Sequence, residues 1–168
     1  GGIYCGNSSE AFVYNNTISA NTSHAYSKNT YNSRRSRTYA YGGGIYGGVS
    51  MTNALTDNNL TDNECYSYTY SKHNNSYSYS YGGGCYISDG TTLIIGEGGA
   101  VSGNTSTSLA EGYSSGLYAY SYGGGIYSTG SGSNIQLMKA QINGNTTAAT
   151  PNTTAHGGGI YSTSATAD

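Results

Sequence analysis

The stretch Gly42-Gly43-Gly44-Ile45-Tyr46 recurs along this chain at a nearly fixed interval. A shortened copy opens the sequence at Gly1-Gly2-Ile3-Tyr4, and further copies occupy 82–86, 123–127 and 157–161. The fourth position of each copy is held by Ile3, Ile45, Cys85, Ile126 and Ile160. The steps between these positions are 42, 40, 41 and 34 residues. Periods of this length are typical of stacked repeats, which bury their apolar faces against one another.

A second marker keeps the same period. An apolar residue followed three positions later by asparagine appears 15 or 16 residues after each of the first four anchors, and the asparagines are Asn21, Asn63, Asn104 and Asn145. Short apolar runs, such as Leu93-Ile94-Ile95, lie between the two markers. Because insertions and deletions fall outside this block, we interpret the anchors and the asparagines as a structural register.

Composition favours an all-β chain over a helical or a disordered one. Gly, Ser, Thr and Asn make up more than half of the 168 residues, which opposes long helices. Polar, low-complexity chains are often unfolded. Here 20 tyrosines, a charged fraction of only 8% and apolar positions held in register argue for a folded chain.

We therefore predict a single right-handed parallel β-helix, or β-solenoid, over residues 1-168. Its repeats of about 40 residues span approximately 1-41, 42-81, 82-122 and 123-156, with a partial one at 157-168. In such a stack, equivalent positions of neighbouring coils touch. A repeat of this length accommodates either one coil carrying an arm or two coils.

Tyrosine-rich segments between the markers are the candidates for those arms or second coils. Tyrosines alternate with small polar residues over 65–70 and again over 77–81, with a polar hexapeptide between them. Strict alternation places the tyrosines of each segment on one face of a strand. Stacked in register, they would form aromatic ladders.

The glycine motif followed by an apolar-x-x-Asn block resembles the repeats of the polymorphic outer-membrane-protein family, which pair a Gly-Gly-Ala-Ile type motif with Phe-x-x-Asn. The resemblance covers nearly the whole chain. It implies a pectin-lyase-like right-handed parallel β-helix and a surface-exposed adhesin or other extracellular protein. Here glycine replaces the alanine and Ile, Leu or Val replaces the phenylalanine, and the tyrosine segments are not part of that signature.

Charged and metal-ligating residues are too sparse to indicate catalysis. Polysaccharide lyases and hydrolases of this implied fold gather several carboxylates on one face. Among the eight acids only Asp57, Asp62 and Glu64 cluster, so a polar turn is favoured over a calcium site. The histidines show no metal-ligand spacing. We therefore expect no enzyme activity, no catalytic, cofactor-binding or metal residues, and no cofactor.

The three cysteines, Cys5, Cys65 and Cys85, contain no C-x-x-C pair. Cys85 occupies an inward anchor position and is interpreted as a small buried hydrophobe. A bridge to it from Cys5 or Cys65 stays open, and we expect at most one disulfide.

Asn-x-Ser/Thr acceptor sequences are dense, which fits a secreted, glycan-coated surface. Three of them coincide with register asparagines, which cannot be both buried and glycosylated. The remaining candidates are Asn7, Asn15, Asn59, Asn74 and Asn152.

These observations predict an extracellular or cell-surface structural protein, a repeat-built stalk or filament subunit that associates with itself head to tail. A surface adhesin or carbohydrate-binding β-helix is the alternative, and a polysaccharide-cleaving enzyme ranks below both. We expect no nucleic-acid partner, because basic residues cluster only at Arg34, Arg35 and Arg37, and no apolar run approaches the length of a membrane span. Since the chain opens inside a repeat, we also expect it to begin within a longer product.

Overall fold

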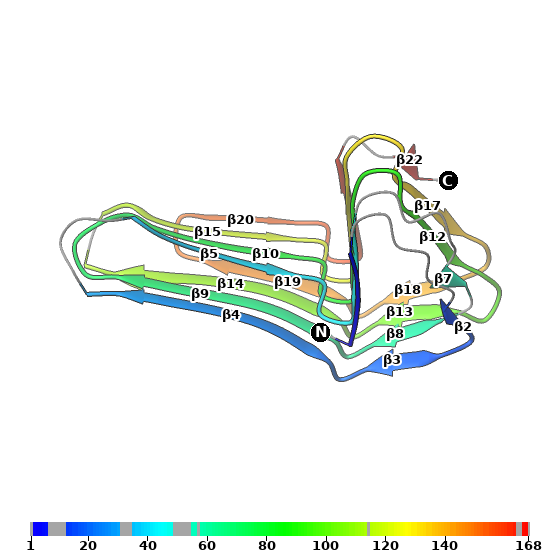
Figure 1. The fold of residues 1–168 in the computed structure, drawn as a ribbon. Coiled ribbons are helices and arrows are strands. Elements are labelled where there is room, and N and C mark those ends of the chain that lie inside the picture. The colour runs from blue at the N-terminus through cyan, green and yellow to red at the C-terminus, as the bar shows by residue number, and fades with distance from the viewer. Residues whose placement is uncertain are drawn as a thin grey trace.

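A computed structural model describes residues 2–6, 13–30, 35–48, 55–56, 58–113, 115–163 and 166–167. Every regular element in these ranges is a β-strand, and the strands pair in parallel within five stacked sheets. The prediction of an all-β chain of stacked parallel strands is thereby confirmed. Successive repeats lie over one another as the coils of a β-solenoid do (Figure 1).

Three sheets form a roughly triangular body at one end of the molecule (Figure 1). Sheet A contains β1 (Ile3–Cys5), β6 (Ile45–Gly47), β11 (Cys85–Ile87), β16 (Ile126–Thr129) and β21 (Ile160–Thr163). Sheet B contains β2 (Val13–Tyr14), β7 (Leu55–Thr56), β12 (Thr92–Ile95), β17 (Asn134–Leu137) and β22 (Thr166–Ala167). Sheet C contains β3 (Thr17–Ser19), β8 (Asn59–Thr61), β13 (Ala100–Ser102) and β18 (Gln141–Asn143).

Two further sheets form a flat arm that projects from the body (Figure 1). Sheet D, the outgoing layer, contains β4 (Thr22–Asn29), β9 (Glu64–Ser71), β14 (Thr105–Gly112) and β19 (Thr146–Thr150). Sheet E, the returning layer, contains β5 (Ser36–Tyr41), β10 (Ser76–Tyr81), β15 (Leu117–Tyr122) and β20 (Thr153–His156). Each described repeat contributes one strand to each sheet it enters, so a repeat is one coil carrying one arm and not two coils.

Like residues lie over like along the stack. In sheet A, Ile45 pairs with Ile3 on one side and with Cys85 on the other. The remaining anchors continue this line, since Cys85 pairs with Ile126 and Ile126 with Ile160. Because side chains of parallel strands sit about 4.8 Å apart along the stack, each inward position becomes a continuous apolar column.

The body has a conventional apolar core. Its fully buried members come from all three sheets and include Ile45, Leu60, Leu93, Val101 and Ile126. Cys85 packs among them as a buried small side chain. Phe12 and Ala54, which the sequence places in the apolar runs, lie outside the described residues.

The arm has an interior of hydroxyl groups instead. The buried side chains of sheets D and E are serine, threonine, alanine or cysteine, and Ser67, Ser78, Ser106 and Ser121 are fully buried. Ser78 Oγ donates to the carbonyl oxygen of Ser67 at 2.7 Å, and Ser121 Oγ makes the equivalent bond to Ser106 one coil later at 2.5 Å. Such small side chains let the two sheets approach closely, and buried hydroxyls such as those of Ser78 and Ser121 find partners across the gap.

Glycine is required where the returning arm turns into sheet A. A Cβ atom on Gly43 would overlap the carbonyl oxygens of Gly83 and Glu64, and one on Gly83 would overlap those of Gly124 and Thr105. These neighbours are backbone atoms of the next coil and of the adjacent corner, so they cannot move aside individually. The glycine motif is therefore the corner at which coils come closest.

The register asparagines form an amide ladder at the corner between sheets C and D. Asn104 Oδ1 accepts from the backbone N–H and from Nδ2 of Asn63, at 3.0 and 2.9 Å. Asn104 in turn donates both groups to Asn145 Oδ1, and its Nδ2 also bonds the Leu60 carbonyl at 2.7 Å. Asn21 donates to Asn63 in the same way. Asn63 and Asn104 thus tie their coils to the coils on both sides.

We predict that Asn104→Ala lowers the free energy of unfolding by about 3 kcal/mol, because it leaves a buried backbone N–H and a buried carbonyl without partners. Urea unfolding followed by circular dichroism measures this loss. Asn21→Ala is the matched control, since Asn21 is only half-buried and should cost clearly less. Equal losses for the two variants would contradict a ladder that works by burial.

Candidate functional surface

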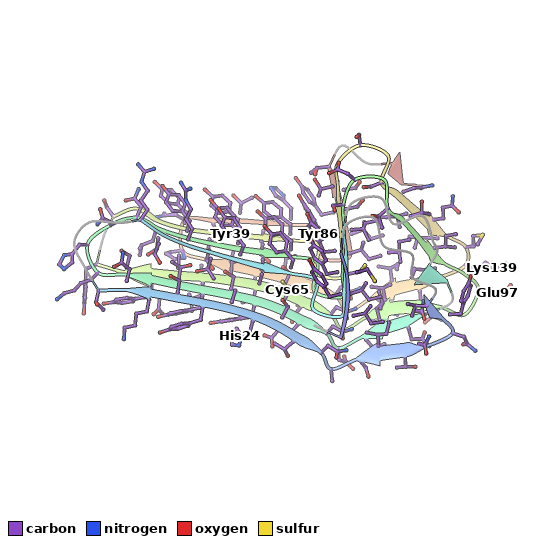
Figure 2. All side chains as sticks on the ribbon, in the orientation of Figure 1. His24, Tyr39, Cys65, Tyr86, Glu97 and Lys139 are labelled. Atoms are coloured by element: carbon purple, nitrogen blue, oxygen red, sulfur yellow. The ribbon has the colours of Figure 1, made fainter. Side chains whose placement is uncertain are left out.

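The most distinctive surface is a continuous array of tyrosines, which we call the tyrosine face. It covers the outer side of sheet E and the adjoining outer side of sheet A (Figure 2). Strand alternation creates it, because the serines of sheet E point inward and its tyrosines outward. Its members are Tyr77 and Tyr118; Tyr39, Tyr79 and Tyr120; Tyr41, Tyr81 and Tyr122; and Tyr4, Tyr46, Tyr86, Tyr127 and Tyr161.

Rings within a row stack face to face from coil to coil. Tyr79 lies 4.8 Å from Tyr39 and 4.9 Å from Tyr120 between ring centroids, with interplanar angles of 8° in both pairs. The row in sheet A opens gradually, from 4.8 Å between Tyr4 and Tyr46 to 5.8 Å at its far end. Each such pair contributes roughly 0.5–1.5 kcal/mol beyond its buried area. The rows therefore stabilise the stack from outside.

The arm and the body meet at a corner filled with tyrosine rings. Tyr41 lies 5.0 Å from Tyr86 at an interplanar angle of 72°, and Tyr81 lies 5.0 Å from Tyr127 at 51°. The first of these contacts is edge-to-face, a geometry that is favourable between aromatic rings, and the second is tilted. Burial here raises the pKa of the Tyr81 and Tyr86 hydroxyls above the ordinary tyrosine value.

The outer side of sheet D carries a second, more mixed set of side chains. Tyr68 stacks on Tyr26 at 5.0 Å, and its hydroxyl donates to Glu111 Oε2 at 2.7 Å. This hydrogen bond raises the pKa of Tyr68 to about 12. His24 lies in β4 and packs edge-on against Tyr66. Arg37 lies in β5 with its guanidinium 5.3 Å from the ring centroid of Tyr77.

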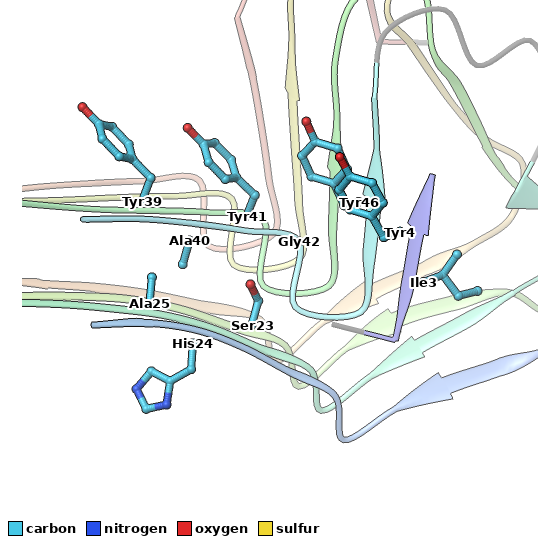
Figure 3. Close-up of a pocket in the computed structure, with 10 residues that line it drawn as sticks. All are labelled: Ile3, Tyr4, Ser23, His24, Ala25, Tyr39, Ala40, Tyr41, Gly42 and Tyr46. Atoms are coloured by element: carbon cyan, nitrogen blue, oxygen red, sulfur yellow. The ribbon is translucent and has the colours of Figure 1, made fainter. Parts of the chain in front are cut away.

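A hollow of about 410 Å³ opens at the β1 end of the tyrosine face (Figure 3). Tyr4, Tyr39 and Tyr41 line it, together with backbone and small side chains of β4 and β5. These three rings begin their rows, and they are 75%, 45% and 37% exposed. Within each row, the rings of neighbouring coils cover one another. The first ring of a row has a neighbour on one side only, so part of its surface is accessible here.

A second hollow of about 400 Å³ lies at the arm tip. Strand β19 pairs only with residues 105–109 of β14, so Ala110, Glu111 and Gly112 line the hollow beyond the end of that pairing. Tyr113, which is 83% exposed, stands at its rim.

All three cysteines are free and buried. Burial raises the pKa of both Cys65 and Cys85 to about 12 and raises that of Cys5 as well. Since the thiolate is the reactive form, these thiols are protected in the folded chain. None of the disulfides left open by the sequence is present.

Three acids of the described residues have partners that are not carboxylates. Glu97 forms an ion pair with Lys139 at 3.2 Å, Glu111 accepts from Tyr68, and Asp89 Oδ1 accepts from the Ser131 backbone N–H. No group of three His, Cys, Asp or Glu side chains in the described ranges could hold a metal ion. Of the acidic cluster singled out in the sequence, Asp57 lies outside those ranges, and Asp62 is exposed.

The glycosylation candidates lie in different environments. Asn15 and Asn152 are exposed and adopt positive φ angles of 50° and 46°. Asn59 is half-buried, and its Oδ1 accepts from the Ala100 backbone N–H at 3.0 Å. Asn74 is half-buried in the turn at the arm tip, and Asn7 lies outside the described residues. Exposure thus favours Asn15 and Asn152 as attachment points.

No protein-family model, curated protein or solved structure matches this chain. Across the described ranges there is no helix long and apolar enough to cross a membrane.

We predict that the fold tolerates neutral pH and loses stability in alkali. When folding raises the pKa of a tyrosine, the folded state favours its neutral form. The contribution of that tyrosine to the free energy of unfolding is therefore complete below its pKa in the unfolded chain, about 10, and disappears as the pH rises through its pKa in the folded chain. For Tyr68 that window runs from about 10 to about 12. Urea unfolding at a series of pH values, with absorbance titration of the phenols, measures the decline.

Tyr68→Phe is the control for this prediction, because it removes the hydroxyl bonded to Glu111 and keeps the stacked ring. Its stability should fall less steeply between these pH values. A single titration of all phenols near 10, with stability unchanged, would contradict the prediction.

Proposed function

We propose that this chain is a structural element of an extracellular filament or cell-surface stalk. The proposal rests on one observation, which is that three kinds of side-chain contact repeat from coil to coil along the axis of the stack. Apolar columns, the amide ladder and the tyrosine rows all run from coil to coil. Because side chains in the interior and on the surface both stack along the axis, they suit a rod that bears load along its length.

We propose further that the coils are right-handed and that the repeats are of the polymorphic outer-membrane-protein type. Parallel strand-to-strand crossovers are overwhelmingly right-handed, which supports the first part. The two motifs that carry the resemblance hold structural positions in this chain, the glycines at a corner and the asparagines in the amide ladder, which supports the second. Glycans on the exposed Asn15 and Asn152 would suit an extracellular location.

The edges of the stack support the proposal of head-to-tail self-association. Strands β5 and β20 are the outer strands of sheet E, and β4 and β19 those of sheet D. Outer strands present unpaired backbone groups, which another strand can bind. Because all pairing within the stack is parallel and in register, a second copy or a further repeat would continue the same columns.

The test is sedimentation velocity over a range of concentrations, in which the sedimentation coefficient should rise with concentration. The His156 carbonyl accepts from the Gly123 N–H just after β15, and the Thr146 N–H donates to the Asn104 carbonyl just before β14. Alternation therefore directs the N–H groups of Ala155 and Ala149 to the open edge. Ala155→Pro and Ala149→Pro remove those donors and should weaken association, with circular dichroism confirming the fold. A monomer at every concentration would overturn head-to-tail association.

A carbohydrate-binding or adhesive role is the second candidate, favoured by the hollow lined by Tyr4, Tyr39 and Tyr41. Elsewhere on the tyrosine face, neighbouring rings cover each other and expose edges and hydroxyls, whereas sugars stack on ring faces. Titration calorimetry with oligosaccharides, using Tyr39→Ala to remove one wall of the hollow, would distinguish this role from a purely structural one.

A further inference from the structure

The residue that follows each strand of sheet C binds the next coil through its backbone N–H. The Asp62 N–H donates to the Ser102 carbonyl oxygen at 3.0 Å. The Gly103 N–H donates in the same way to the Asn143 carbonyl oxygen at 3.2 Å. Gly144 holds the equivalent place after β18, which is the outer strand of sheet C (Figure 1). Since no later strand of this sheet lies in the described part of the chain, the Gly144 N–H points to an open edge.

The peptide bond between Asn143 and Gly144 is therefore held at one atom only. Its oxygen accepts from Gly103, and its N–H has no further coil to donate to within the described ranges. The equivalent peptide one coil inward, between Ser102 and Gly103, is bonded at both its oxygen and its N–H. Asn143 and Gly144 are also exposed. Fewer bonds and greater exposure make local opening easier at this edge than inside the stack.

This position matters because Asn143-Gly144 is the one Asn-Gly pair in the sequence. When the peptide of such a pair rotates, the glycine nitrogen can attack the side-chain carbonyl carbon of the asparagine. A nitrogen–carbon bond forms, and the side-chain amide leaves as ammonia with the proton of the attacking nitrogen. Glycine favours the attack, because it has no Cβ to crowd the resulting five-membered succinimide. Water then opens the ring at either carbonyl, which gives aspartate or isoaspartate.

We propose that Asn143 is a site of spontaneous deamidation at the open edge of sheet C, with water as the only co-reactant. The register asparagine two residues later is held instead. Asn145 Oδ1 accepts from Asn104 Nδ2 at 2.9 Å, and Asn145 Nδ2 donates to the Val101 carbonyl at 2.7 Å. Its amide must leave the ladder before it can react, whereas no such ladder holds the exposed edge residue.

The one Asp-Gly pair of the sequence shows the same contrast. Asp89-Gly90 would isomerise through the same succinimide, with water as the leaving group. Here the Gly90 N–H donates to the Ser131 carbonyl at 3.0 Å, and Asp89 Oδ1 accepts from the Ser131 N–H at 3.0 Å. Both the attacking nitrogen and the attacked side chain are thus occupied by the next coil. The stack protects this pair and leaves the edge pair unprotected.

Deamidation changes the edge at which a further coil would pair. Isoaspartate adds one carbon to the backbone and places a carboxylate beside it, which displaces the carbonyl that the Gly103 N–H binds. A coil stacked on β18 would accept from the Gly144 N–H, as β18 itself does from Gly103, and would protect the site. An uncovered edge therefore acquires a chemical mark that a covered edge does not. This modification goes beyond the structural role and requires no self-association.

The experiment incubates the folded chain at low concentration and mildly alkaline pH, with a parallel sample unfolded in urea. Ser102→Asn is the matched variant, because it places a second Asn-Gly pair one coil inward, where the Gly103 N–H is bonded. Trypsin cleaves after Lys72 and Lys139, so peptide 73–139 reports position 102 and peptide 140–168 reports Asn143. Mass spectrometry measures the initial rate of amide-to-acid conversion in each peptide, and an isoaspartyl methyltransferase labels isoaspartate.

In the folded variant, peptide 140–168 should convert at least severalfold faster than peptide 73–139, because one further hydrogen bond must open at the inner site. In urea the two peptides should convert at similar rates. Asn143→Ser, which copies the serine of the preceding coil, should abolish conversion of peptide 140–168. Equal rates in the folded variant, conversion located at Asn145 or Asn152, or an Asn143 that reacts only in urea would overturn the proposal.

Discussion

The whole structure depends on parallel strand pairing between coils in strict register. One spacing, that of neighbouring strands, sets the distance between apolar side chains in the body, between amides in the ladder and between rings on the surface. The glycine corner permits this spacing, because a Cβ at Gly43 or Gly83 would push against backbone of the next coil. Without that close approach the other columns would lose contact together.

The arm shows how a chain so poor in large apolar residues forms two packed layers. Its inward serines and threonines are small enough for sheets D and E to come within hydrogen-bonding reach. Ser80 and Ser108, for example, bond hydroxyl to hydroxyl at 2.8 Å while both are buried. A buried hydroxyl without a partner is costly, so this interior works only because the partners repeat with the coils.

The interior of the arm lacks large apolar side chains, and stacked tyrosines on its outer surface bury apolar area instead. Stacked rings remove aromatic surface from water without occupying the narrow interior, and the corner between Tyr41 and Tyr86 attaches the arm to the body. The same arrangement leaves hydroxyl-bearing ring edges facing solvent. A surface built for axial stability is thus also a dense array of phenol groups.

The sequence by itself determined the all-β class and the parallel stacking, because a fixed period with glycine, isoleucine and asparagine at matching positions is meaningful only when equivalent positions touch. It also placed the alternating tyrosines on one side of their strands. Only the tertiary structure decided that each repeat is one coil with an arm, since strand alternation is the same in an arm and in a second coil. The fold also decided which side of these strands faces water. Ser67 and Tyr68 alternate in the same way whichever of them points inward, and serine takes the inward position because sheets D and E approach closely. The bonding of Asn58 to the preceding coil, through the Asn16 backbone, went unnoticed in the sequence because a single pair of asparagines 42 residues apart carries little signal.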